Sequence, residues 1–378
     1  MDVEIHRIPL TPAEIATPAD DARATALMAG VNDLAQEWFL EAFGHDDFLD
    51  PVEVVRAQYA DQRYTRRAVW IALPRGTDPV SFAPSLALGR AAIHLSLEDN
   101  THLVEADVIV RRAHRKQGIG TALATMIAQE LRGSGRTTIG AWTPHPAVPA
   151  DHPDALAAKT GVGVIDRADP AAAWLLRRGF ELEQAERYSV LRIPEDRASW
   201  LETVAGLRRE AARRAGTDYE LLRWSGITPE AWRERMAELH RRMSVDAPSA
   251  GFDYREESWD AERVVHRDEQ MLETGHTNAF AAIRHVPSGH LVAYTELRWL
   301  TTKPHVVYQE DTLVHGEHRG HRLGMLVKAA NLEHLFALNP HAARIHTWNA
   351  EENRFMLDIN EALGFRAAAV EGAWQKVV

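Results

Sequence analysis

Apolar and polar positions follow the same order in two stretches of this chain. In each stretch a strand-like apolar run, at residues 104–110 or 306–314, precedes a polar loop that contains glycine. A run with apolar residues at three- and four-residue steps follows, ending near Leu131 and near Leu338, and this spacing is typical of a helix packed on a sheet. The pattern predicts strand, loop and amphipathic helix twice.

The two loops share the frame V-x-x-x-H-R-x-x-[GR]-[IL]-G. Each fixed residue of the first loop has a counterpart 204 residues later in the second loop. The pairs are Val110 with Val314, His114 with His318, Arg115 with Arg319, and Gly120 with Gly324. Asp107 and Asp311 keep the same offset. Such self-similarity predicts two copies of one structural unit.

Each copy continues with a strand ending at a tryptophan and then a short helix that closes with a Gly-Phe pair. The equivalent residues are Trp142 and Trp348, Gly179 and Gly364, and Phe180 and Phe365. The interval from Trp to Gly is 37 residues in the first copy and 16 in the second. An insertion of 21 residues is therefore expected in the first copy, as a loop at 143–164.

Hairpin strands are expected at 68–73 and 85–97, and again at 280–284 and 290–300. This order of elements predicts an α/β protein with a mixed sheet of the α+β kind. Helix formers and paired arginines predict a helical connector at 197–216. The 378 residues then divide into an N-terminal domain (1–196), the connector and a C-terminal domain (217–378), as the length allows.

The amino-acid composition excludes several classes of function. With 43 Lys and Arg against 54 Asp and Glu, the formal charge is −11, so no attraction to nucleic acid or to anionic membranes is expected. There is no cysteine, which excludes disulfides, thiolate nucleophiles and Cys-ligated zinc. Neither a signal peptide nor a long apolar run is recognised in the sequence, and a cytoplasmic protein is expected.

The loop before the first predicted helix is suited to an anion. Backbone N–H groups at a helix start are unpaired, and glycine lets a phosphate approach them closely. A Walker loop would require Gly-Lys-Ser/Thr directly before the helix, and a dinucleotide fingerprint would require glycine where Leu123 stands. What remains is Arg-x-x-Gly-x-Gly, from Arg115 to Gly120.

This motif resembles the pyrophosphate-binding motif of the GNAT superfamily of N-acetyltransferases, which use acyl-coenzyme A. The surrounding strands and helices match in order, and they match twice. The second half, with D-T-L-V-H-G-E-H-R-G-H-R-L-G, is similar to a tandem GNAT type frequent in actinobacteria. The resemblance covers roughly residues 1–193 and 217–378, and it implies two GNAT domains with acetyl-CoA as cosubstrate and no metal.

The resemblance also implies which residues hold the cosubstrate. Val110 and Val314 would end the fourth strand of each domain. The first pyrophosphate cradle would comprise Arg115, Lys116, Gly118, Ile119 and Gly120, and the second Arg319, Gly320, Arg322, Leu323 and Gly324. Arg322 stands where the pattern has its first glycine, so either this cradle is weakened or the guanidinium itself contacts phosphate.

A GNAT enzyme usually removes the amine proton with a carboxylate on the fourth strand. The resemblance points to Glu310 as best placed, with Asp311 and Asp107 as the repeated pair. Adjacent strand residues face opposite sides, so Glu310 and Asp311 cannot both enter one cleft unless a bulge intervenes. Each of these carboxylates could instead cap a loop or pair with arginine.

The usual general acid of the superfamily is a tyrosine four residues before the Gly-Phe glycine. Leu175 and Asn360 stand there, so a tyrosine-assisted mechanism is not expected at that position. Tyr308 is either a substitute or a core residue. Asn349 and Asn353 match positions near the pantetheine arm, and their alternative role is helix capping.

Together these features predict an N-acetyltransferase that moves an acetyl group from acetyl-CoA to a primary amine of a small molecule or peptide. The second half is the expected catalytic half. The alternative is a non-catalytic acyl-CoA-binding or scaffolding protein. His315, His318 and His321 recur every three residues, but they span a strand-to-helix loop, and no metal site is expected there.

Overall fold

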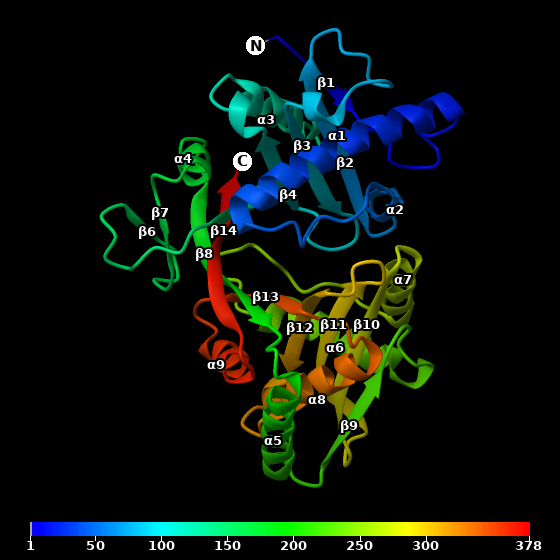
Figure 1. Cartoon of the computed structure of the whole chain (residues 1–378), viewed down its shortest axis with the longest axis vertical. Helices are drawn as coiled ribbons and strands as arrows, with labels where there is room; N and C mark the ends of the chain where they lie inside the picture. Colours follow the sequence, from blue (N-terminus) through cyan, green and yellow to red (C-terminus); the bar gives the residue numbers. More distant parts are fainter. Residues whose placement is uncertain (1) are drawn as a thin grey trace.

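The computed structural model of the chain describes residues 2–378, within which lie fourteen strands and nine α-helices (Figure 1). The strands are β1 (Val3–Arg7), β2 (Thr65–Pro74), β3 (Gly89–Ser96), β4 (Leu103–Val110), β5 (Thr138–His145), β6 (Ala155–Ala157), β7 (Val164–Asp166), β8 (Glu181–Arg192), β9 (Tyr219–Trp224), β10 (His276–His285), β11 (His290–Leu300), β12 (Val306–Val314), β13 (Arg344–Ala350) and β14 (Arg366–Val377). The helices are α1 (Pro18–Phe43), α2 (Val52–Ala60), α3 (Ile119–Glu130), α4 (Pro170–Leu176), α5 (Arg197–Ala215), α6 (Arg233–Asp246), α7 (Ala261–Glu273), α8 (Leu323–Leu338) and α9 (Arg354–Leu363).

Twelve of the strands form one sheet, in the order β1-β2-β3-β4-β5-β14-β8-β13-β12-β11-β10-β9. Neighbours are antiparallel except for β4 with β5 and β12 with β13, which are parallel. The order on one side of the centre repeats on the other in reverse. The expected mixed α/β class, with a repeated unit, is thus the architecture of the chain.

The two central strands are exchanged between the halves. The last strand of the chain, β14, lies between β5 and β8 of the first half, and β8 in turn pairs with β13 of the second half (Figure 1). Each half therefore completes its sheet with a strand from the other. The expected division at 196 and 217 describes two sequence repeats, and in space these repeats interlock.

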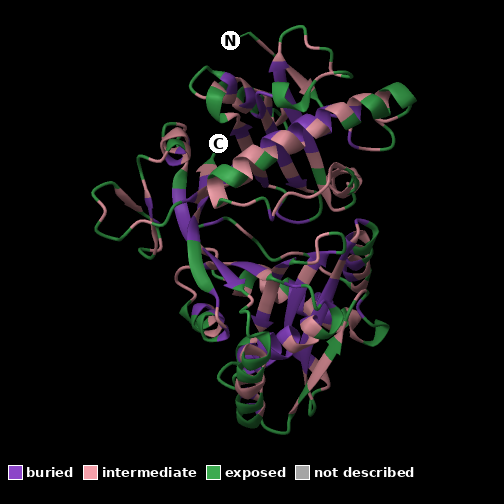
Figure 2. Cartoon of the chain, in the orientation of Figure 1, coloured by how far each residue is buried: buried purple, intermediate pink, exposed green. Residues whose placement is uncertain are grey.

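Helices cover both faces of the sheet, because side chains alternate along each strand. In β10, Ala279 and Ala281 pack with α8 and α5, whereas Phe280 and Ala282 pack with α6 and α7. In β2, Val69 likewise packs with α1 on one face. Buried positions accordingly run through the sheet, and exposed positions follow the outer sides of the helices (Figure 2).

The helix expected at 197–216 is α5, and it packs against α8 through Val204, Ala211 and Ala215. It is thus part of the core of the second half. The expected insertion differs from a plain loop: β5 continues to His145, and the segment that follows carries the small hairpin of β6 and β7.

Repeat comparison did not reveal the helices that open each half. The first is α1, which begins with a capping box between Thr17 and Asp20 and ends at Gly44 in a left-handed conformation. The second half has α6 and α7 at the corresponding place. These helices differ in sequence between the halves, so no shared motif marks them.

The loops after these opening helices cross to the opposite half. Between α1 and α2, the carboxylate of Asp47 is 3% exposed and accepts two hydrogen bonds of 2.6 Å from Arg344. Between α6 and α7, the backbone N–H of Arg255 donates to Asn100, 2.7 Å away. The halves therefore hold each other by loops as well as by strands. Across residues 2–378, no helix is both long enough and apolar enough to cross a membrane.

Candidate functional site

Two wedge-shaped openings interrupt the hydrogen bonding of the sheet. Strands β4 and β5 pair only over their first three residues, ending at Glu105 with Gly140, although both strands continue. Strands β12 and β13 also pair over three residues only, ending at Tyr308 with His346. Beyond those pairs each strand presents backbone groups without a ladder partner on that side, which an extended ligand can use.

A bulge distinguishes the second wedge from the first. Thr312 is the register partner of Thr295, and Gln309 is the partner of Leu297. Two residues of β12, at positions 310 and 311, therefore lie opposite one residue of β11. In the first half the ladder between β3 and β4 is regular, and Asp107 lies opposite Ala92.

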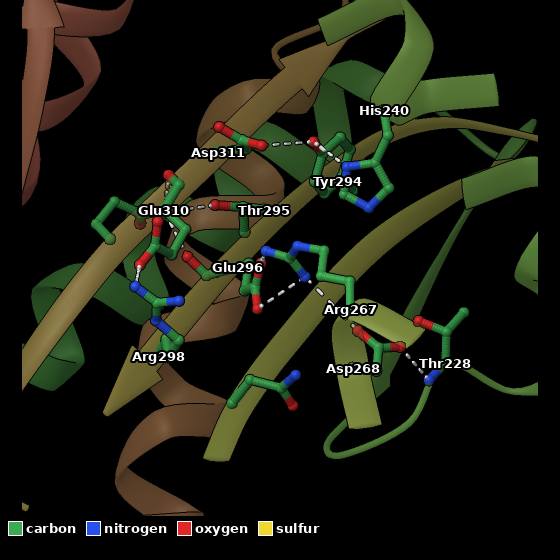
Figure 3. A network of polar contacts seen from close by, with 12 residues as sticks. Thr228, His240, Arg267, Asp268, Tyr294, Thr295, Glu296, Arg298, Glu310 and Asp311 are labelled. Carbon is green, nitrogen blue, oxygen red and sulfur yellow. Dashed lines mark hydrogen bonds and ion pairs between the residues drawn. The ribbon is translucent and has the colours of Figure 1, made fainter. Parts of the chain in front are cut away.

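The bulge directs both expected carboxylates to one face of the sheet (Figure 3). Glu310 makes a 2.8 Å ion pair with Arg298, and Asp311 accepts a hydrogen bond of 3.2 Å from the hydroxyl of Tyr294. Arg298 and Tyr294 are four residues apart on β11 and so share one face. The second half therefore contains the bulge that allows Glu310 and Asp311 to lie on the same side of the sheet.

Asp311 lies in a buried polar network (Figure 3). Burial raises the pKa of Asp311, and the nearby Arg267 guanidinium opposes that shift. The Tyr294 hydroxyl also lies 3.2 Å from Nδ1 of His240, whose pKa burial lowers well below its usual range. The imidazole of His240 is therefore neutral, and the positive charge of this network resides on Arg267, which pairs with the fully buried Glu296.

In the first half, Asp107 is engaged differently. It forms a 3.1 Å ion pair with Arg90, and the ring of Tyr59 packs nearby against His94. Burial lowers the pKa of His94 to about 4, so this histidine is uncharged near neutral pH. Asp107 as a base remains a prediction, and the regular ladder gives it no counterpart to the carboxylate pair of β12.

The two expected cradles have the same backbone shape. Gly118 and Arg322, the residues directly before α3 and α8, have φ values of 86° and 61°, and Lys116 and Gly320 have φ values of 62° and 88°. Arg322 therefore adopts the left-handed conformation that glycine adopts in the first loop. Neither helix start has a side-chain cap, which leaves the amides free for an anion.

The charged surroundings of the cradles differ. In the first loop, Arg115 forms a bidentate ion pair with Glu41 of α1, with distances of 2.8 and 2.5 Å. In the second loop, the corresponding Arg319 is exposed and has only a 3.5 Å contact with Asp246. Each arginine also donates to the end of its strand, Arg115 to Val110 and Arg319 to Val314. The second cradle thus has the freer cation.

The remaining cradle positions pack the helix starts. Ile119 and Leu323 are 2% and 1% exposed. A Cβ added at Gly324 would lie 3.1 Å from Ile359, and one added at Gly120 would lie 3.5 Å from Val110. These glycines let the helix approach the strand end closely, and their contact with a cosubstrate remains a prediction.

The asparagines expected near the pantetheine arm have local partners. Asn349 accepts a 2.7 Å hydrogen bond from Asn360, the residue at the usual acid position, and Asn353 caps α9 by accepting from the N–H of Met356. Helix capping, the alternative for Asn353, is therefore observed. Tyr308 donates to the carbonyl oxygen of Asp47, and burial raises its pKa.

A cavity of about 340 Å³ lies where the halves meet, on the face of the sheet that carries Arg298 and Tyr308. This volume is in the range of small-molecule sites. Its lining combines aromatic and charged side chains from both halves: Trp38, Phe39, Phe43, Phe48, Asp50, Gln58, His276, Arg298, Tyr308, Trp348 and Glu371. Sequence comparison missed most of these residues, since they come from the unrepeated opening segments and from the exchanged strand.

Two groups of potential metal ligands are brought together: His315 with Glu317 and His318, and His45 with Asp47 and His346. In the second group, Asp47 is already bound by Arg344, which makes it a structural contact between the halves. The first group includes two of the three histidines that recur in the sequence, whereas His321 packs against Tyr219.

Comparison with known proteins agrees with this architecture. Residues 30–152 match the model of the acetyltransferase (GNAT) family. A tandem GNAT protein from the clavulanic acid biosynthesis pathway is similar over 99% of this chain and 98% of its own, with a TM-score of 0.69 and 20% identity. A GCN5-related N-acetyltransferase from Sphaerobacter thermophilus is similar over 99% of this chain and 95% of its own, with a TM-score of 0.56 and 13% identity. No curated protein matches the chain.

Proposed function

Because residues 30–152 match the GNAT family and the whole chain has the fold of a tandem GNAT protein, we propose that it transfers an acetyl group from acetyl-CoA to a primary amine of a small molecule or peptide. We place the reaction in the second half. The observation that carries this choice is the bulge that sets Glu310 and Asp311 on one face beside the opening between β12 and β13.

The residues present fit acetyl-CoA. The uncapped start of α8 offers backbone N–H groups to the pyrophosphate, and the left-handed backbone of Gly320 and Arg322 shapes the loop around it. Arg319 and Arg322 supply exposed guanidinium groups there. When bound, acetyl-CoA supplies the thioester carbonyl that an amine attacks.

The chain contributes orientation and proton transfer. Backbone amides of β12 beyond Tyr308 lack a ladder partner, and they polarise the thioester carbonyl. The cavity holds the amine on the other side of that carbonyl. Asp311 takes the amine proton, directly or through water, because its raised pKa brings it nearer neutrality than an exposed carboxylate. Tyr294 positions Asp311 through its hydrogen bond.

Glu310 acts beside Asp311 as the partner of Arg298, a residue that lines the cavity. The new C–N bond forms as the C–S bond breaks, and the thiolate leaves without a tyrosine at position 360. Asn360 cannot protonate it, so the proton reaches sulfur from water.

The first half has a different role in this proposal. The ladder between β3 and β4 has no bulge, and Glu41 forms an ion pair with Arg115, the arginine of the first cradle. It provides one wall of the cavity, with the aromatic end of α1 and Asp50. This half is therefore where the alternative of an acyl-CoA-binding scaffold without turnover applies.

The test is release of free thiol from acetyl-CoA in the presence of a panel of primary amines, together with CoA binding by calorimetry. Acetyl transfer predicts amine-dependent thiol release. CoA binding without thiol release from any amine would instead support the scaffolding alternative for the whole chain.

A further inference from the structure

Two glutamates from equivalent repeat positions face each other at the centre of the sheet. Glu186 lies six residues after Phe180, and Glu371 lies six residues after Phe365. They are register partners across β8 and β14. Since each residue meets its own repeat counterpart, the approximate two-fold axis of the molecule passes between them.

Neither glutamate has a cationic partner. Among residues 2–378, the side chains of Glu186 and Glu371 form no hydrogen bond and no ion pair with any other side chain. Arg187, the next residue of β8, points to the other face of the sheet, where it pairs with Glu351 and Glu361. Burial raises the pKa of Glu186 to about 7 and that of Glu371 to about 8, with the neighbouring carboxylates Glu352 and Glu186 adding to the respective shifts. Two like charges at one site are unfavourable, so the pair either takes up a proton or binds a ligand that supplies the counter-charge.

Glu371 opens into the cavity between the halves. Aromatic rings form the adjacent wall, where Phe48 and Trp348 have their centroids 5.3 Å apart. Ring faces attract organic cations and also pack against methylene groups. The same cavity borders Arg298, the partner of Glu310, so one space lies beside both Arg298 and Glu371, and Glu186 is the register partner of Glu371.

We propose that Glu186 and Glu371 bind a second, non-reacting ammonium group of the acceptor, so that the protein selects diamines and polyamines over monoamines. This rests on the proposed function, because the other amine is the one that is acetylated. The aromatic wall encloses the carbon chain between the two nitrogens. Mg²⁺ or Ca²⁺ is disfavoured because each takes six or more oxygen ligands, and the remaining lining offers only Asp50 as a further carboxylate.

The experiment compares diamines of three to six carbons with alkylamines of the same chain length, by calorimetry on the full chain. Wild-type protein binds the best diamine at least about tenfold more tightly than its matching monoamine, because the monoamine leaves the carboxylate pair without a counter-charge. E371Q lowers that ratio toward one. E186Q does the same and replaces E371Q if the latter does not fold.

E53Q is the matched control. Glu53 is an exposed residue of α2 outside the cavity lining, and its substitution removes the same charge. It retains the diamine preference. Equal affinities in the wild type, or a preference that survives both E371Q and E186Q, would overturn the inference.

Thiol release separates the two levels of the proposal. Turnover of monoamines without any diamine preference refutes the second ammonium site and leaves acetyl transfer standing. A diamine preference in calorimetry without thiol release from any amine refutes acetyl transfer and leaves the site standing.

Discussion

The hydroxyl of Tyr294 contributes to the proton affinity of Asp311, the carboxylate that we propose as the base. Its hydrogen bond to Asp311 stabilises the charged form and lowers the pKa, against the larger effect of burial, which raises it. Y294F removes the hydrogen bond while keeping the ring. The pKa of Asp311 then rises further, and the acidic limb of the kcat/KM profile moves to higher pH.

This shift is measured as the initial rate of thiol release across pH with the amine well below its KM, which reports kcat/KM. Tyr308→Phe serves as the comparison, since the Tyr308 hydroxyl binds a backbone carbonyl oxygen of Asp47 and not a carboxylate. An acidic limb at the same pH in Y294F and wild type would show that Asp311 does not carry the titration that governs turnover.

Glu371 gives a second prediction for a single residue. A carboxyl group whose pKa rises from its ordinary 4.5 to about 8 on folding binds more protons in the folded than in the unfolded state over that interval. Its contribution to stability therefore falls as pH rises from about 5 to about 8. E371Q lacks this loss, and its stability relative to wild type should increase with pH.

The measurement is urea unfolding of E371Q, E53Q and wild type at intervals from pH 5 to pH 8. The gain should reach about 1 kcal/mol at the upper end, less than the full shift implies because solvent reaches the cavity. A stability difference that does not vary with pH would mean that Glu371 titrates normally in the folded protein.

At the scale of elements, the two strand-loop-helix units could be predicted from sequence because their signals are local. The apolar period and the glycines of the loop both lie within about twenty residues. The bulge at Glu310 could not be derived, since it depends on how β12 registers with β11. A left-handed Arg322 was equally hidden, because arginine rarely adopts that conformation.

The cradles can be compared by introducing a carboxylate at the equivalent residues Gly118 and Arg322. Aspartate tolerates the left-handed region, and its charge at the helix start repels a pyrophosphate. R322D should weaken CoA binding at least about tenfold. G118D should have a smaller effect, because Glu41 already neutralises Arg115 in that loop.

Calorimetric titration with CoA decides this prediction. The single variant E41Q, which keeps Gly118, provides a further check. It frees Arg115 from its ion pair and should create or strengthen CoA binding in the first loop. Stronger loss of affinity in G118D than in R322D would move the main CoA site to the first half.

At the scale of the whole molecule, the exchange of β8 and β14 was beyond sequence analysis. Both strands begin directly after the Gly-Phe pairs, and periodicity does not state which strand becomes a neighbour. The cavity follows from this exchange, since Glu371 reaches it on β14 and Phe48 reaches it on a crossing loop. Its lining therefore required the assembled fold.

The exchange of β8 and β14 also predicts how two separate pieces of the chain behave. Residues 1–196 lack β14, and residues 197–378 lack β8, so neither piece alone can complete its sheet. We expect each piece to be unfolded or aggregated alone and to recover a cooperative thermal transition when the two are expressed together. Circular dichroism melting tests this, and a cooperative monomeric transition in either isolated piece would contradict interlocking.

The central claim is that the second half carries out acetyl transfer with the carboxylates of the β12 bulge. The most direct test is thiol release from acetyl-CoA by D311N and D107N, with D218N as an exposed control of the same chemistry. We predict that D311N lowers kcat/KM by about a hundredfold or more, as loss of a general base does, and by much more than D107N. Loss of turnover in D107N with D311N near wild type would contradict the account and place the reaction in the first half.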